Sequence, residues 1–181
     1  GGASSFFTGE YDEVRVYDHV LSAAEVYNLN NAGAEPSPLS HLGAWSFNDG
    51  FQDVSGHGHD LTNNGGVTRV PGKVGMAASF DGVDDYLSVV APGFQQPRTR
   101  YSMGAWVKPT GSGSDLGIMG DNDLEYHHDM TIHANYEIYG YTRTGGNYSK
   151  TLFAGTQDSN GWIHVAQTFN RSARPGRCRR L

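Results

Sequence analysis

The segment from Phe7 to Gly33 constrains the fold most, because it has the form of the end of a domain yet stands at the front of the chain. Val14 and Val16 alternate with charged residues, which is typical of a half-buried strand. Ser22 and Glu25 then have the spacing of a capping box, in which the Ser side chain accepts the N–H of the third helical residue and the Glu reaches back. The segment therefore predicts a strand followed by a short, capped helix.

A linker separates this opening from a longer region that is rich in strands. Residues 35–41 contain two prolines among mostly polar residues, a pattern typical of a linker. From Leu42 onward, short apolar stretches alternate with turns rich in glycine, asparagine and aspartate. So many short strands predict an all-β chain, folded as a sandwich or a barrel. Strands are expected at 44–47, 75–80, 86–90, 101–107, 116–119, 130–142 and 162–169.

The charge distribution argues against nucleic acid as a partner. The formal net charge is −6, but residues 171–181 hold five arginines and no acid, and we interpret them as a tail. The remaining 8 lysines and arginines stand against 19 acidic residues, and the resulting charge of −11 repels nucleic acid and anionic membranes. No apolar stretch approaches the ~20 residues needed to span a bilayer. Cys178 is the single cysteine, so a disulfide within the chain is excluded.

Five motifs, in this order, resemble those of laminin-G-like domains, which belong to the concanavalin-A-like jelly rolls. They are Trp45–Gly50, Asp53–Gly56, Gly75–Tyr86, Ser102–Lys108 and Trp162–Ala166. The opening stretch Asp12–Tyr17 and the helix after it resemble the closing strand and helix of the same family. The resemblance implies an antiparallel two-sheet β-sandwich of the jelly-roll type, with one short helix near the N-terminus.

The resemblance divides the chain into four parts. Residues 1–34 are the closing strand and helix of one repeat, 35–41 a linker, 42–170 a truncated second laminin-G-like domain, and 171–181 an Arg-rich tail. The second domain lacks the final strands of the family. The first segment, in contrast, consists almost entirely of such a final strand and the helix after it. Because the two deficits are complementary, we hypothesise that residues 7–33 fold back and complete the second domain. The connecting residues can span ~30 Å when extended, which is enough to cross the end of a sandwich.

The loop from Asp53 to Asp60 is the best candidate for a structural metal site. Carboxylates and backbone carbonyls in a glycine-rich loop suit Ca²⁺, which prefers several oxygen ligands in irregular geometry. The family resemblance implies calcium where this loop meets the closing strand. The expected ligands are therefore Asp53, Asp60, Asp12 and Glu13. The alternative is a solvated turn that Asp53 caps.

Three other polar clusters are interpreted as structural. The stretch from Asp81 to Asp85 fits a tight hairpin turn better than a cation site. Asp121, Asp123 and Glu125 resemble the acidic strand of retaining β-glucanases, but that motif begins with Glu and has aromatic surroundings, so a polar loop rim is favoured. The remaining cluster consists of histidines whose spacing matches no zinc motif and which we interpret as exposed turn residues: His57, His59, His127, His128 and His133.

Alternation over residues 133–143 predicts a ligand-binding face. Ile138 and the even-numbered residues beside it are assigned to the core, so the side chains of the odd-numbered residues are expected to point outward. Tyrosine rings stack on sugar C–H surfaces, and Asn, Glu and Arg side chains form hydrogen bonds with hydroxyl groups. The alternative is an ordinary solvent-facing strand. The predicted ligand-binding residues are His133, Asn135, Glu137, Tyr139, Tyr141 and Arg143. The tryptophans lie inside strand motifs and are predicted to be core residues: Trp45, Trp106 and Trp162.

These observations predict a non-catalytic carbohydrate-binding or adhesive accessory module of a secreted or cell-surface multidomain protein. The expected cofactor is structural Ca²⁺. The expected partners are a glycan or an extracellular protein and neighbouring repeats of the parent chain, with no nucleic acid and no membrane span. A structural or protein–protein interaction repeat without a glycan ligand is the main alternative, because this fold serves both uses. A glycoside hydrolase is a weaker alternative, and no enzymatic activity is expected.

Overall fold

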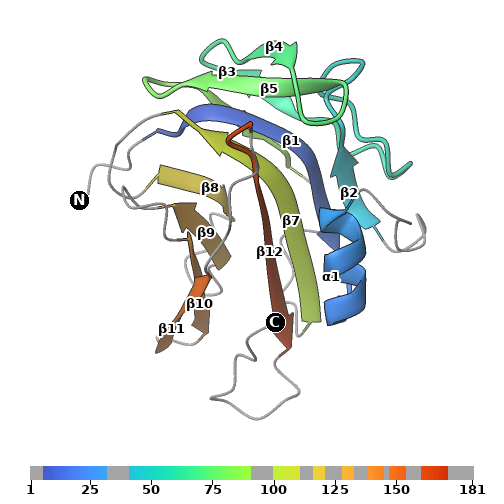
Figure 1. Ribbon diagram of the computed structural model, residues 1–181, viewed down its shortest axis with the longest axis vertical. Helices are drawn as coiled ribbons and strands as arrows, with labels where there is room; N and C mark the ends of the chain where they lie inside the picture. The colour runs from blue at the N-terminus through green and yellow to red at the C-terminus, as the bar shows by residue number, and fades with distance from the viewer. Residues whose placement is uncertain are drawn as a thin grey trace.

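The computed structural model describes residues 6–31, 41–90, 100–110, 116–120, 128–132, 138–144, 147–153 and 160–170. This part of the chain consists mostly of strands in antiparallel sheets, with one short helix (Figure 1), which confirms the predicted all-β class. In chain order the elements are β1 (Thr8–Tyr17), α1 (Ala23–Asn30), β2 (His41–Trp45), β3 (Thr62–Asn64), β4 (Thr68–Pro71), β5 (Met76–Asp81), β6 (Tyr86–Ser88), β7 (Arg100–Pro109), β8 (Leu116–Gly120), β9 (His128–Ile132), β10 (Ile138–Thr144), β11 (Asn147–Phe153) and β12 (Ile163–Asn170).

Strand β1 lies inside a six-stranded sheet of order β12-β7-β1-β5-β4, in which β2 also pairs with β1. The first half of β1, Thr8–Tyr11, pairs with β5, and the second half, Val14–Tyr17, pairs with β2. On its other side, β1 pairs with β7. The N-terminal strand is therefore hydrogen-bonded on both sides to strands from the later part of the chain, as the fold-back hypothesis requires.

A β-bulge interrupts β1 between Asp12 and Arg15. Asp12 lies opposite Trp106 and Arg15 opposite Gly104, so β1 uses one residue more than β7 over this stretch. Glu13 lies in the bulge with a φ of 52°, in the left-handed region that few residues other than glycine adopt. Residues three apart face opposite sides of a regular strand. The bulge instead places Asp12 and Arg15 on the same face of the sheet.

Strands β8 to β11 form a four-stranded sheet of order β11-β10-β9-β8. The expectation of one continuous strand over 130–142 is wrong, because Ile132 pairs with Ile138 and β9 is antiparallel to β10. Both isoleucines are buried, with 1% of their surface exposed. Since they are an even number of residues apart, they face the same side whether the chain runs straight or turns back. Alternation alone does not distinguish these arrangements.

The main apolar core draws side chains from both of these sheets. Tyr11 and Val107 come from the six-stranded sheet, and Met130 and Ile138 come from the four-stranded sheet. The Tyr11 hydroxyl also donates a hydrogen bond to the backbone oxygen of Gly117 in β8, at 2.9 Å. Burial of each such apolar side chain contributes about 1.5–3 kcal/mol. The shared core therefore couples the two sheets.

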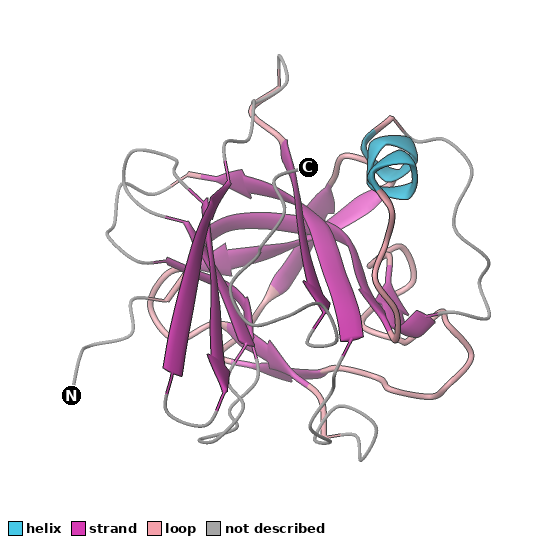
Figure 2. Ribbon diagram, turned by 90° about the horizontal axis from the view of Figure 1, so that it is seen from below, coloured by secondary structure: helices cyan, strands magenta, loops and turns pink. Residues whose placement is uncertain are grey.

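Helix α1 lies on the side of the six-stranded sheet away from the four-stranded sheet (Figures 1 and 2). Its N-terminus has the predicted capping box, in which the Glu25 N–H donates to Ser22 Oγ at 3.3 Å and the Ser22 N–H donates to Glu25 Oε2 at 2.7 Å. Leu29 packs with Leu21 and Tyr17 in a small separate cluster. Among the described residues, no helix has the length and apolar character needed to cross a membrane.

The three tryptophans are buried, as predicted from their strand motifs. Trp45 belongs to the main core, whereas Trp106 and Trp162 pack with Ala77 in a third cluster. Lys73 places its Nζ 4.4 Å from the centre of the Trp106 ring. At 3%, 8% and 4% exposure respectively, Trp45, Trp106 and Trp162 do not offer open platforms for a sugar ring.

Candidate functional site

The Asp53 carboxylate organises the loop that follows β2. Its Oδ1 accepts the N–H groups of Ala44 at 3.0 Å and Ser55 at 2.9 Å. Its Oδ2 accepts the Ser55 hydroxyl at 2.8 Å and the His59 N–H at 3.0 Å. Burial acts to raise the pKa of Asp53, but these hydrogen bonds outweigh it and lower the pKa to about 2. Asp53 is therefore ionised at neutral pH, and four protein donors already satisfy its oxygens.

Asp60 meets Asp53 at the other end of the same loop. The Asp53 N–H donates to Asp60 Oδ1 at 2.9 Å. Beside this contact, the Leu61 N–H donates to the Phe51 oxygen at 2.9 Å. The structure thus brings these two predicted metal ligands together, and their hydrogen bonds close the base of the loop.

Asp12 has a different environment, inside the protein and against the turn between β4 and β5. Its surface is 0% exposed, and its Oδ2 accepts the Val74 N–H at 2.7 Å. Its Oδ1 is buried and makes no hydrogen bond within the described part of the chain. Burial raises the pKa of Asp12 to about 6, and the nearby Glu13 carboxylate adds to the rise, whereas the backbone N–H groups of Val74, Glu13 and Lys73 act to lower it. A buried carboxylate oxygen without a donor is the kind of group that a cation satisfies.

The remaining predicted ligand, Glu13, forms an ion pair with Arg15 across the bulge. Asp12 meanwhile packs so closely on Gly72 that a Cβ added there would lie 2.7 Å from Asp12 Oδ2. Within the described residues, the four predicted ligands do not contribute to any group of three or more metal-binding side chains whose ligand atoms lie within 4.8 Å of one another. The structure places them in two groups, Asp53 with Asp60 and Asp12 with Glu13.

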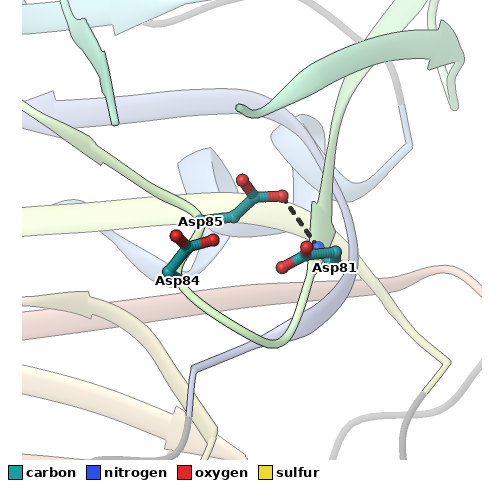
Figure 3. Close-up of side chains that lie close together, drawn as sticks. All are labelled: Asp81, Asp84 and Asp85. Atoms are coloured by element: carbon teal, nitrogen blue, oxygen red, sulfur yellow. Dashed lines mark hydrogen bonds between the residues drawn. The ribbon is translucent and has the colours of Figure 1, made fainter. Parts of the chain in front are cut away.

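The one such group among the described residues is formed by Asp81, Asp84 and Asp85 (Figure 3). Asp81 and Asp84 are exposed and Asp85 is buried. The Asp81 N–H donates to Asp85 Oδ2 at 2.9 Å, and the Val83 N–H donates to Asp81 Oδ1 at 2.7 Å. These contacts form a turn, but the expected hairpin is wrong, because β5 pairs with β1 and β4 while β6 pairs with β3. The chain leaves one sheet at this turn and enters another.

The predicted ligand-binding residues fall partly within β10. Tyr139 is half-buried, next to the core residue Ile138, and its Cα pairs with Thr131 of β9 and Leu152 of β11. Tyr141 and Arg143 continue the same strand, paired with Lys150 and Tyr148 of β11. The other three predicted ligand-binding residues lie outside the described residues: His133, Asn135 and Glu137.

A pocket of about 310 Å³ follows β2, and no motif in the sequence predicts it. The turn signal at Asn48–Gly50 marks its place in the sequence but does not show a hollow. Phe47 precedes that turn with a φ of 58°. The pocket is lined by Ser46, Phe47, Asp49, Gly50, Gln52 and Val54.

The carboxylates that resemble a glucanase motif lie outside the described residues, as do two of the histidines. They are Asp121, Asp123, Glu125, His127 and His133.

Comparison of the chain with protein-family models, with curated proteins and with solved structures finds no significant match.

Proposed function

We propose that the chain is a non-catalytic carbohydrate-binding module with a laminin-G-like jelly-roll sandwich, part of a secreted or cell-surface multidomain protein. The observation that carries this proposal is the position of Tyr139 in the four-stranded sheet. Ile138 faces the core with 1% exposure, so alternation directs the half-buried Tyr139 to the opposite face. A glycan bound on that face would lie across β8, β9 and β10.

The neighbours of Tyr139 in the sheet support a sugar ligand. Gly117, Thr131 and Tyr139 lie side by side in register on β8, β9 and β10. A Cβ added at Gly117 would meet nothing within 4 Å, so there is open space beside the row. Thr131 Oγ1 is buried and makes no hydrogen bond within the described residues. An aromatic ring beside an uncrowded glycine provides a stacking surface for a sugar ring, whereas the Thr131 hydroxyl reaches such a ligand only if its side chain turns outward.

We also propose structural Ca²⁺ as a brace at the bulge of β1. Of the four carboxylates considered, Asp12 fits a cation best, because its buried Oδ1 has no donor within the described residues, whereas Asp53 accepts four hydrogen bonds. Backbone carbonyls and water would complete the oxygen ligands that calcium needs. Added Ca²⁺ should raise the melting temperature of the wild type by ligand linkage and leave Asp12→Asn unchanged.

The test of glycan binding is retention on affinity gels cast with xylan, mixed-linkage glucan, chondroitin or mucin, after a glycan-array screen of the intact chain. We expect retention by at least one glycan, and we expect the double variant Tyr139→Ala/Tyr141→Ala to lose it. Tyr27→Ala, which alters a tyrosine 68% exposed on α1, is the matched control and should be retained normally. Absence of retention on every glycan, or unchanged retention of the double variant, would overturn the proposal in favour of a structural or protein-interaction repeat.

A further inference from the structure

The sequence His57-Gly58-His59 places two imidazole rings next to each other on an ordered loop. Their centroids are 5.9 Å apart and their planes differ by 14°. Gly56 and Gly58 adopt φ values of 89° and 74°, a left-handed conformation that side chains with a Cβ rarely adopt. A Cβ at either glycine would meet no atom within 4 Å, so these positions favour glycine for its backbone conformation and not for space. The loop geometry therefore stacks the two rings.

The hydrogen bonds of His59 determine which of its ring nitrogens carries the proton. Nδ1 lies 2.6 Å from the backbone oxygen of Leu42, and a carbonyl only accepts, so Nδ1 is the protonated nitrogen. In the neutral ring the lone pair is therefore on Nε2. The backbone of His59 is also held, because its N–H donates to Asp53 Oδ2 at 3.0 Å and its oxygen accepts the Trp45 Nε1–H at 2.9 Å.

Ser55 determines which ring nitrogen of His57 carries the proton. The Ser55 hydroxyl donates its only proton to the ionised Asp53 carboxylate at 2.8 Å. Ser55 Oγ is therefore an acceptor toward His57. It lies 3.0 Å from the ring nitrogen Nδ1 of His57 and accepts the backbone N–H of the same residue at 3.3 Å. Nδ1 of His57 consequently carries the proton, and the lone pair of the neutral ring is again on Nε2. Asp53 and Ser55 thus orient a histidine that is itself exposed.

We propose that Nε2 of His57 and Nε2 of His59 form a two-imidazole site for a divalent cation of the zinc, copper(II) or nickel(II) class. Histidine ligands of such metals usually donate their other ring N–H to a carbonyl or an oxygen acceptor, which is the arrangement found at both rings. Imidazole nitrogen suits these ions, whereas Ca²⁺ prefers oxygen. Water would complete the coordination. This proposal is independent of glycan binding and of the calcium site at Asp12.

The site requires one local adjustment. A zinc ion with Zn–N bonds of about 2.0–2.1 Å holds two nitrogens about 3.3 Å apart at the tetrahedral angle. The stacked rings, with centroids 5.9 Å apart, must therefore tilt toward each other at their Nε2 edges. His57 is exposed and His59 has only 20% of its side chain exposed, so the tilt falls mainly on His57. The negative net charge of −6 favours the approach of a cation.

The first test is the tautomeric state of the imidazoles by nitrogen-15 NMR of the intact, metal-free chain near pH 8. We expect both His57 and His59 to carry their proton on Nδ1. On titration with Zn²⁺, the Nε2 resonances of these two residues should shift. A proton on Nε2 of either ring in the metal-free protein would overturn the proposal, and so would zinc-induced shifts confined to other histidines.

The second test is calorimetric titration of Zn²⁺ and Cu²⁺ into His57→Gln and His59→Gln. Each substitution removes one imidazole ligand and should weaken binding at least about tenfold. The matched control is His19→Gln, which changes a partly exposed histidine paired with Asp18 and should bind like the wild type. His57→Gln is expected to keep the wild-type melting temperature, because the ring is exposed. Wild-type affinity in His57→Gln, or no binding by the wild type at millimolar metal, would contradict the proposal.

Discussion

At the scale of single residues, two carboxylates show how their surroundings decide what an aspartate does. Asp53 receives hydrogen bonds from Ala44, Ser55 and His59, which hold its pKa at about 2. Asp12 is buried with one oxygen bonded to Val74 and the other without a donor in the described chain, and its pKa is raised to about 6. Asp53 therefore stabilises its loop as an anion, whereas ionisation of Asp12 destabilises the metal-free fold.

We expect Asp12→Asn to stabilise the metal-free protein above pH 6. The folded-state pKa of Asp12 lies above its ordinary value of 3.8, so its favourable contribution is complete below 3.8 and is lost as the pH rises through about 6. The cost of the ionised group at pH 8 is about 3 kcal/mol. Asn avoids this cost and still accepts the Val74 N–H. Urea denaturation between pH 4 and pH 8 with a chelator measures the difference.

His164 acts in the opposite direction and has to be separated from this effect. Burial lowers its pKa to about 4, with a smaller contribution from Arg15, so its stabilising contribution is lost as the pH falls from 6.5 toward 4. Because Asp12→Asn retains His164, the difference between wild type and variant isolates Asp12. Parallel pH profiles for the two proteins would contradict the assignment.

At the scale of elements, the capping box of α1 should contribute measurably to stability. Ser22→Ala removes the acceptor of the Glu25 N–H and leaves the Glu25 side chain without its hydroxyl partner. The expected loss in the free energy of unfolding is about 1 kcal/mol, as for other N-cap serines. Chemical denaturation measures it, with Tyr27→Phe at an exposed position of α1 as the control. Equal losses in the two variants would show that the cap itself contributes nothing.

The capping box of α1 could be predicted from local spacing, whereas three strand assignments could not. The capping box is visible because Ser22 and Glu25 lie within one helical turn. The hairpin of β9 and β10 escaped prediction because the buried Ile132 and Ile138 have the same parity in either arrangement. Strand β4 was missed because it is short, largely exposed and ends at Pro71. Strand β11 was missed because it is mostly polar.

The candidate sites follow the same rule at a larger scale. The Asp53–Asp60 pair could be predicted, because both residues belong to one short loop. The partner of Asp12 is Val74, which the six-stranded sheet brings close from a distant part of the chain. No local pattern in the sequence contains that contact. The stacking of His57 and His59 depends on two left-handed glycines and on hydrogen-bond directions, which spacing alone does not encode.

At the scale of the whole molecule, β1 connects the parts of the fold. It pairs with β2, β5 and β7, and Tyr11 reaches across the core to Gly117 in the other sheet. Strand β1 in this position cannot fray without disrupting the six-stranded sheet. The fold-back hypothesis, which was drawn from the family resemblance, predicted this pairing.

Hydrogen–deuterium exchange of the intact chain, read by mass spectrometry over the peptide Thr8–Tyr17, tests this account most directly. Because β1 is hydrogen-bonded on both sides, we predict that its amides exchange as slowly as those of β7 and only through global unfolding. Exchange of this peptide at the rate of an unstructured segment, while β7 remains protected, would contradict the central position of β1 and the architecture built on it.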